Sequence, residues 1–77
     1  MREFVEYLLT QIVRDEQALA VDEVPAEEGI IIEIRVSPED MGLVIGKEGR
    51  TIRSIRSLAK AKAIKDGVRV RVELVEE

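Results

Sequence analysis

The sequence predicts a small α+β domain in which three helices pack on one face of a three-stranded sheet. A chain of 77 residues is enough for one small domain. Apolar residues alternate in two segments, as they do in strands, and recur at steps of three and four in others, as they do in helices. The resulting order is α-β-β-α-α-β. No repeat or linker interrupts it, so we expect residues 1–77 to form a single domain.

Residues 2–17 have the pattern of an amphipathic helix. Their apolar residues form one stripe, which consists of Phe4, Val5, Leu8, Leu9, Ile12 and Val13. Tyr7 lies at the edge of this stripe, and we expect its ring to be buried with the hydroxyl in water. The alternative is a ring that stacks on a ligand.

A hairpin of two strands is expected next. The first strand, residues 19–24, is short, and Pro25 directly after it favours an edge position in the sheet. Gly29 closes an acidic turn, where we expect a positive φ. The second strand, residues 30–36, has alternate residues facing the helices, namely Ile30, Ile32, Ile34 and Val36.

A short helix then begins near Pro38 and ends at Gly46. Ser37 is expected to cap it, Pro38 suits its first turn, and Glu39 and Asp40 suit its dipole. A long helix follows over residues 50–65 and ends at Asp66-Gly67. The last strand, residues 68–74, places its valines and Leu74 inward.

Composition argues against an enzyme. The chain has no cysteine and no histidine, so it lacks thiolate ligands and the commonest general base. We therefore expect no catalytic residue, no cofactor and no metal. No apolar run approaches the roughly 20 residues of a membrane span, and the N-terminus has no signal-peptide pattern. A cytoplasmic protein without a membrane partner is the plain expectation.

The segment between the two later helices has the features of a phosphate-binding turn. Gly46 and Gly49 permit a tight turn that no side chain obstructs, and Lys47 between them adds a cation. The long helix starts at once, so its bare amides and its dipole point into the turn. Apolar residues on both sides suit a flat base, and a phosphate beside a base indicates nucleic acid.

The distribution of charge supports this interpretation, although the net charge of −4 does not. Residues 47–65 contain seven basic residues and one acid, a net of +6, which leaves −10 for the rest of the chain. The local field steers a polyanion more than the total does. The alternative is a solvated helix whose lysines only aid solubility.

The string V-I-G-K-E-G-R-T-I-R-S-I, from Val44 to Ile55, resembles the core of a KH domain. KH domains hold about four nucleotides of RNA backbone at a G-x-x-G loop. With the element order above, the resemblance is to the type II KH fold and covers nearly the whole chain, with the loop at residues 46–49. It implies a nucleic-acid site made of Val44, Ile45, Gly46, Lys47, Glu48, Gly49, Arg50, Ile52 and Arg53.

Each apolar member of this site has an alternative role in the core. The core is favoured for Ile45, whereas Val44 and Ile52 are evenly balanced between core and groove wall. Glu48 places a negative charge beside the expected phosphate path, and it also suits a helix N-terminus. Because the loop has no aromatic residue, we expect binding of modest affinity with limited discrimination between bases.

Leu58 lies away from the apolar stripe of the long helix, beside Ala61 and Lys62. An exposed leucine among small residues lets another helix approach, so a symmetric dimer through Leu58, Ala61 and Lys62 is one expectation. The other is a single exposed leucine, which is normal on a protein surface.

The length, the lack of a further domain and the element order resemble the small stand-alone bacterial KH proteins, which are KhpA-like. That resemblance implies a cytoplasmic single-stranded RNA-binding protein that acts as an RNA chaperone or post-transcriptional regulator. It also implies pairing with itself and with a larger Jag-like KH protein, and a link to cell shape and cell-wall growth. Two alternatives stay open: an assembly subunit with little RNA binding, and a single-stranded DNA binder.

Overall fold

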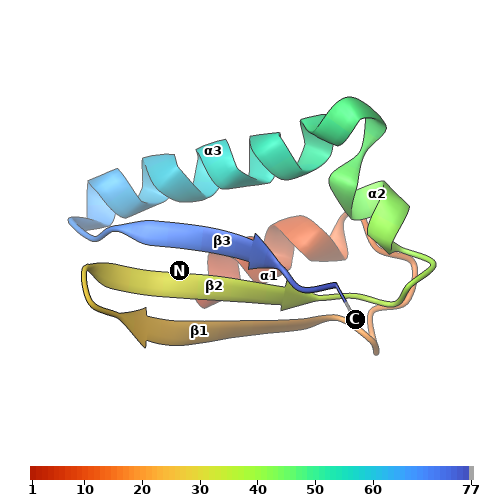
Figure 1. The fold of residues 1–77 in the computed structure, drawn as a ribbon, viewed down its shortest axis with the longest axis horizontal. Helices are drawn as coiled ribbons and strands as arrows, with labels where there is room; N and C mark the ends of the chain where they lie inside the picture. Colours follow the sequence, from red (N-terminus) through yellow and green to blue (C-terminus); the bar gives the residue numbers. More distant parts are fainter. Residues whose placement is uncertain (77) are drawn as a thin grey trace.

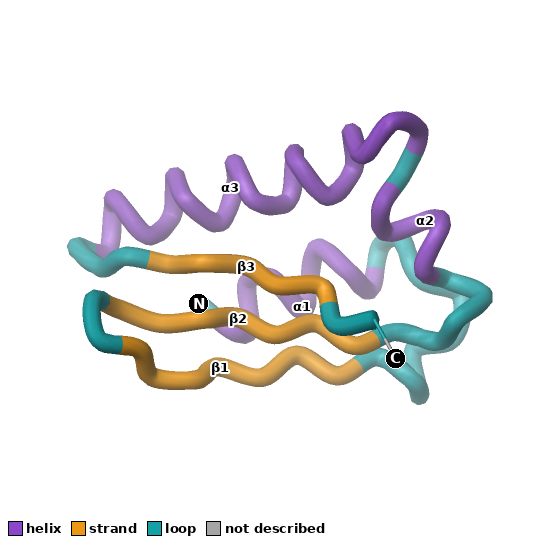
Figure 2. Tube along the Cα trace, viewed as in Figure 1, coloured by secondary structure: helices purple, strands orange, loops and turns teal. Residues whose placement is uncertain are grey.

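The structure is a computed structural model that describes residues 1–76, so that residue 77, the last of the expected domain, lies outside it. Figures 1 and 2 show the chain path. The elements in chain order are α1 (Arg2–Thr10), β1 (Ala20–Ala26), β2 (Gly29–Arg35), α2 (Met41–Ile45), the 3₁₀ turn η1 (Lys47–Gly49), α3 (Arg50–Asp66) and β3 (Val70–Leu74).

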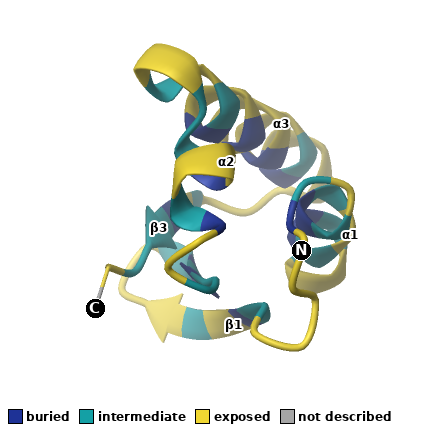
Figure 3. Ribbon diagram, turned by 90° about the vertical axis from the view of Figure 1, so that its right-hand side faces the viewer, coloured by how far each residue is buried: buried dark blue, intermediate teal, exposed yellow. Residues whose placement is uncertain are grey.

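The three strands form one mixed sheet in the order β1-β2-β3. β1 and β2 form an antiparallel hairpin, whereas β2 and β3 are parallel, with Ile32 opposite Val72. A parallel pair needs a crossover, and α2, η1 and α3 supply it. The helices lie on one side of the sheet, where α1 packs on β1 and α3 packs on β3 (Figure 3). The predicted α+β class with the type II KH arrangement is confirmed.

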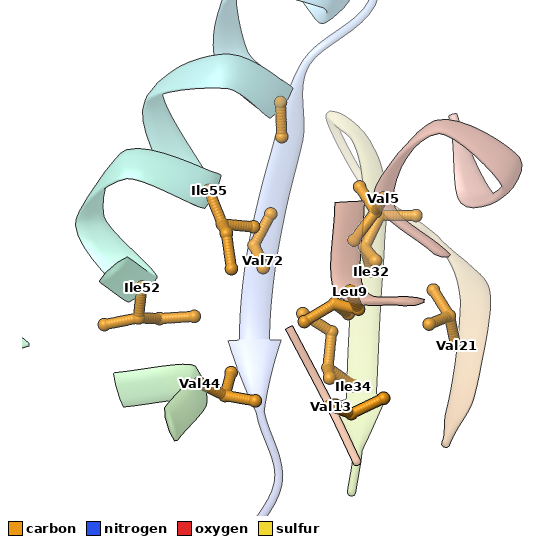
Figure 4. Close-up of a cluster of buried hydrophobic side chains, with 11 residues drawn as sticks. Val5, Leu9, Val13, Val21, Ile32, Ile34, Val44, Ile52, Ile55 and Val72 are labelled. Carbon is orange, nitrogen blue, oxygen red and sulfur yellow. The ribbon is translucent and has the colours of Figure 1, made fainter. Parts of the chain in front are cut away.

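The core fills the space between this helical layer and the sheet (Figure 4). Ile32 and Ile34 of the central strand are completely buried, as are Val5 and Leu9 of α1. The remaining buried members of the cluster are Val13, Val21, Val44, Ile52, Ile55, Ala59 and Val72. The aliphatic core that the alternating pattern predicts is therefore present.

The first helix ends at Thr10, so its predicted extension to residue 17 is wrong. Beyond it, Asp15 Oδ1 accepts hydrogen bonds from the backbone N–H groups of Gln17 and Ala18, at 3.2 and 3.3 Å. Such a side-chain-to-backbone turn competes with helical bonding. The backbone N–H groups of Arg14 and Asp15 are also engaged, because both donate to Asp40 Oδ2.

Tyr7 is 64% exposed, and the prediction of a buried ring is wrong. Its neighbours Val5 and Leu9 point into the core, and Tyr7 lies on the opposite side of the helix from them. The ring therefore faces solvent.

The boundaries of all three strands differ from the predicted ones. β2 spans Gly29–Arg35 rather than residues 30–36, and β1 begins at Ala20 rather than at residue 19. β1 continues through Pro25 to Ala26, which an edge strand permits because its outer side needs no N–H donor. β3 begins at Val70 rather than Val68, since the Val68 N–H donates to the Ala63 carbonyl at 2.9 Å and closes the end of α3. Val68 is consequently exposed and not turned inward.

The start of the short helix also differs from the prediction. α2 begins at Met41 rather than near Pro38. Ser37 Oγ accepts from the Asp40 backbone N–H at 3.2 Å, so the serine does cap this turn. The Asp40 side chain does not serve the helix dipole, because it is buried and bonded to the segment after α1.

Candidate nucleic-acid interface

The glycine loop is a one-turn bend between two helices. α2 ends when the chain reaches Gly46, η1 spans Lys47–Gly49, and α3 starts at Arg50 without a further linker. The Gly49 N–H donates to the Gly46 carbonyl at 3.1 Å and closes the turn. The loop is therefore a closed turn that lies at one end of the helical layer (Figure 1).

Three residues of this loop adopt positive φ angles. The values are 75° at Gly46, 58° at Glu48 and 74° at Gly49. Within residues 1–76, Glu48 is the one non-glycine residue with such a φ. Left-handed backbone costs little for glycine but is uncommon for other residues. The glycines at 46 and 49 thus fit the conformation, whereas Glu48 adopts it against its preference.

The two glycines serve the loop in different ways. A Cβ on Gly46 would overlap the Thr51 hydroxyl and lie 2.6 Å from Thr51 Cβ, so the first turn of α3 packs directly on this position. A Cβ on Gly49 would meet only Arg53 Nη1, at 3.4 Å. Gly46 is therefore required for packing, and Gly49 mainly for its φ.

The expectation of bare amides in the turn does not hold for two of them. The Gly49 N–H donates to Gly46, and the Arg50 N–H donates to the Lys47 carbonyl. These two groups are engaged within the turn and are not available to a phosphate.

The apolar residues of the predicted site divide between core and surface. Val44 is completely buried and Ile52 is 7% exposed, so both pack in the core and hold the loop from beneath. They therefore do not form a groove wall. Ile45, for which the core was favoured, is half-buried and borders the loop at the surface. Leu43, which the sequence did not single out, is also exposed on α2.

The cations of the predicted site are exposed and carry no internal partner. Lys47, Arg50 and Arg53 form no ion pair with any residue in the described range 1–76. Cations elsewhere in the chain do pair, such as Lys62 with Asp66 at 3.0 Å and Arg69 with Glu28 at 2.9 Å. The electrostatic attraction of this surface is consequently available to an external anion.

The three residues of the predicted dimer face differ in their exposure and in their contacts within the chain. Leu58 is 48% exposed and Ala61 is exposed. Lys62 is instead engaged within the chain, because its ammonium pairs with Asp66 and lies 6.0 Å from the centre of the Phe4 ring of α1. Leu58 and Ala61 are thus the two members that face solvent.

Two residues that the sequence did not place in the site lie beside it. Arg56 and Lys60 continue the basic residues down α3, next to β3. The Arg56 Nε–H donates to the Val72 carbonyl at 3.3 Å. Their spacing from Arg53 is visible in the sequence, but their position against a strand edge depends on the tertiary fold.

No helix in the described part of the chain combines the length and apolar character that crossing a membrane requires.

Comparison with known proteins gives one consistent result. The family model for KhpA/KhpB, KH domain, matches residues 2–74. The RNA-binding protein KhpA of Clostridium perfringens is 48% identical over 75 residues, which cover 97% of this chain and 100% of that protein. KhpA of Chlamydia pneumoniae is 40% identical over 77 residues, covering 100% of this chain and 99% of that protein. KhpA of Aquifex aeolicus is 36% identical over 76 residues, covering 99% and 96%.

These relatives carry the name of a binding protein and of no reaction, which agrees with the lack of histidine and cysteine in this chain. The match extends over α1, the sheet, the glycine loop and α3 alike. The chain belongs to the KhpA/KhpB family of KH-domain proteins.

Proposed function

We propose that this protein binds single-stranded RNA through the loop Gly46-Lys47-Glu48-Gly49 and the start of α3. One observation carries the proposal: a glycine turn lies beside three exposed cations, Lys47, Arg50 and Arg53, that have no acidic partner within residues 1–76. Relatives of matching length are named RNA-binding proteins.

The proposed contacts are made mainly to the phosphate backbone of the nucleic acid. The phosphates lie over Gly49, where a Cβ would meet only Arg53 Nη1, and Lys47 and Arg50 neutralise their charge. Gly46 shapes the turn, because Thr51 fills the space beside it. Ile45 offers an apolar surface for a neighbouring base. Because phosphate contacts carry little sequence information, recognition favours single strands in general over one sequence.

Charge reversal in the loop tests the proposal. Lys47→Glu combined with Arg50→Glu should weaken binding of a fluorescent single-stranded RNA by at least tenfold at low salt, because two of the phosphate contacts are lost. Lys65→Glu is the matched control, since Lys65 is an exposed cation of α3 remote from the loop. Equal affinities for both variants and the wild type would remove the loop as the contact. A stable partner complex without any RNA binding would instead favour an assembly subunit.

The same experiment with single-stranded DNA separates the two nucleic acids. The loop contacts described above involve phosphates, which both polymers carry. A preference for RNA at equal length and sequence would locate a further contact at the 2′-hydroxyl.

We further propose that the protein acts in the cytoplasm as an RNA chaperone or post-transcriptional regulator. The support is its small size and its loop-centred, backbone-directed contacts, which suit transient binding to many RNAs. A strand-annealing assay measures this: the wild type should accelerate annealing of two complementary RNAs, and the Lys47→Glu, Arg50→Glu variant should not.

We also propose pairing of two KH units through α3, either with a second copy or with a larger Jag-like KH protein. The exposed Leu58 and Ala61 support this face, and a pair of units would gain avidity for longer RNA. Light scattering on Leu58→Glu tests the homodimer: a mass that falls from dimer to monomer supports it, and an unchanged mass relative to the wild type excludes it.

A further inference from the structure

Lys47 differs from the other lysines of the chain in its surroundings. The chain has four lysines, and the remaining three all lie on α3, at positions 60, 62 and 65. Lys62 is engaged within the chain, because its ammonium pairs with Asp66 at 3.0 Å. Lys65 is exposed, and the two helical turns that precede it contain no arginine. Lys47 is the one lysine that lies between glycines in a turn.

Two arginines lie beside Lys47 at the glycine loop. The Arg50 backbone N–H donates to the Lys47 carbonyl, so these two residues are one turn apart. A Cβ on Gly49 would lie 3.4 Å from Arg53 Nη1, which places the Arg53 guanidinium against the loop. Neither arginine forms an ion pair with a residue of the described range 1–76. The loop therefore combines two permanent cations with one amine.

Lys60 also has an arginine one turn before it on α3, namely Arg56. That guanidinium is engaged, however, because its Nε–H donates to the Val72 carbonyl at 3.3 Å. The combination of an exposed lysine with two unengaged arginines is therefore a property of the glycine loop.

Arginine and lysine differ in what they can do to a small phosphate compound. A guanidinium stays charged at physiological pH, and its planar fork suits phosphate oxygens, whereas a lysine amine becomes a nucleophile once it has lost its proton. An acyl phosphate offers a group to each of them. Its phosphate can be held by arginines, and its acyl carbon can be attacked by an amine.

We propose that the glycine loop binds acyl phosphates, such as acetyl phosphate, and that Lys47 takes the acyl group from them. The neutral Nζ amine attacks the acyl carbon, and an N–C bond forms. The C–O bond to the phosphate breaks, and its electron pair leaves with the phosphate. One amine proton passes to that phosphate or to water. The products are a neutral amide at Lys47 and inorganic phosphate. This inference rests on the proposed phosphate contacts at the loop and adds a modification of the same site.

Acylation of Lys47 has a consequence for the proposed RNA binding. It removes the charge of one of the cations that contact the RNA backbone, so the affinity for RNA falls. RNA phosphates and acyl phosphates use the same arginines, Arg50 and Arg53. Bound RNA therefore protects Lys47, and only the RNA-free protein is modified.

Rates of acetylation at the four lysines test the site. The full chain is incubated with acetyl phosphate, and peptide mass spectrometry follows each lysine over time. Lys47 should react at least threefold faster than Lys65, the matched control, because a held phosphate raises the local concentration of acyl groups. N-acetoxysuccinimide transfers the same acetyl group but has no phosphate. With this reagent the rates at Lys47 and Lys65 should differ less than twofold.

Removal of the two arginines provides a second measurement. Arg50→Gln combined with Arg53→Gln should bring the rate at Lys47 with acetyl phosphate to within twofold of the rate at Lys65. The rate at Lys47 with N-acetoxysuccinimide should stay unchanged, which shows that the loop is still exposed and intact. Arg2→Gln combined with Arg69→Gln is the matched control, since these exposed arginines lie outside the loop and α3. It should keep the preference for Lys47.

The outcomes distinguish this inference from the proposed function. An excess of single-stranded RNA should slow acetylation of Lys47 and leave Lys65 unchanged. If RNA binds at the loop but Lys47 reacts no faster than Lys65 with acetyl phosphate, acyl transfer alone is wrong. If Lys47 is faster with both reagents, its amine is reactive without a held phosphate, which also overturns the inference. If Lys47 is preferred with acetyl phosphate alone but no RNA binds, the proposed function is wrong and the acyl-transfer site is supported.

Discussion

Gly46 packs directly against Thr51, so that the first residue of the glycine loop is in close contact with the first turn of α3. A Cβ on Gly46 would overlap the Thr51 hydroxyl and lie 2.9 Å from the Thr51 backbone nitrogen. The backbone there is left-handed as well, with φ at 75°. Gly46 is thus constrained twice, by space and by conformation.

Gly46→Ala should destabilise the protein, because both constraints are violated. We expect a loss of about 1–3 kcal/mol in the free energy of unfolding. Gly46→Ala combined with Thr51→Ser should remain destabilised, since the Thr51 hydroxyl and the positive φ persist. Urea denaturation measures both. Gly46→Asp would therefore be a poor test of RNA binding, because it would disturb the loop itself.

Glu48→Gln should strengthen RNA binding about two- to fivefold, because it removes a negative charge from beside the phosphate path while keeping the side-chain size. Glu48→Gly removes the same charge and also suits the φ of 58°. Equal affinities for the two variants, measured by fluorescence anisotropy, would assign the effect to charge. No change with either variant would mean that Glu48 points away from the bound strand.

Asp40 should make stability depend on pH in the acid range. Asp40 as a whole residue is 1% exposed. The backbone N–H of Asp15 donates a hydrogen bond to the Asp40 carboxylate and lowers the pKa of Asp40 below its ordinary value of 3.8. Hydrogen bonds from Arg14 and Ser37 lower this pKa further, whereas burial acts in the opposite direction. A lowered folded-state pKa stabilises the fold above pH 3.8, and this contribution is lost as the pH falls through the folded pKa.

Asp40→Asn should therefore lower the melting temperature at pH 7. The difference in melting temperature between this variant and the wild type, the gap, should become smaller as the pH falls below 3.8. Thermal denaturation followed by circular dichroism from pH 7 to pH 2.5 measures the gap. Glu39→Gln is the matched control, because Glu39 is an exposed neighbour. A gap that stays constant over this range would show that the Asp40 charge does not stabilise the fold.

Ile32→Ala should cost about 2–5 kcal/mol of unfolding free energy, because Ile32 is completely buried in the central strand. Tyr7→Ser provides the comparison: its side chain is exposed, and we expect a change within about 0.5 kcal/mol. A large loss for Tyr7→Ser in urea denaturation would contradict the observed orientation of α1.

The sequence predicts the order of elements and most of the core, because both follow from local periodicity. Ile32 and Ile34 alternate with outward residues, and the step of three from Ile52 to Ile55 keeps one face of α3 inward. The end of α1 does not follow from local pattern. It depends on Asp40, which is 25 residues from Asp15 in the chain. Contacts over such a separation are fixed by the fold.

The candidate site at the glycine loop could likewise be predicted only in part from the sequence. Its glycines and cations can be identified from spacing alone. Spacing alone cannot predict which of the adjacent apolar residues Val44 and Ile45 points inward, because both have the same chemistry. Only the rotation of α2 about its axis buries Val44. The position of Arg56 and Lys60 beside β3 could not be predicted for a related reason, since it depends on how α3 packs against that strand.

Chemical-shift mapping with a single-stranded oligouridylate tests the central claim most directly. We predict that amide signals of residues 45–53 shift, while those of the outer face of the sheet stay unchanged. Shifts confined to β1, α1 or the outer sheet face, with residues 45–53 undisturbed, would contradict the account.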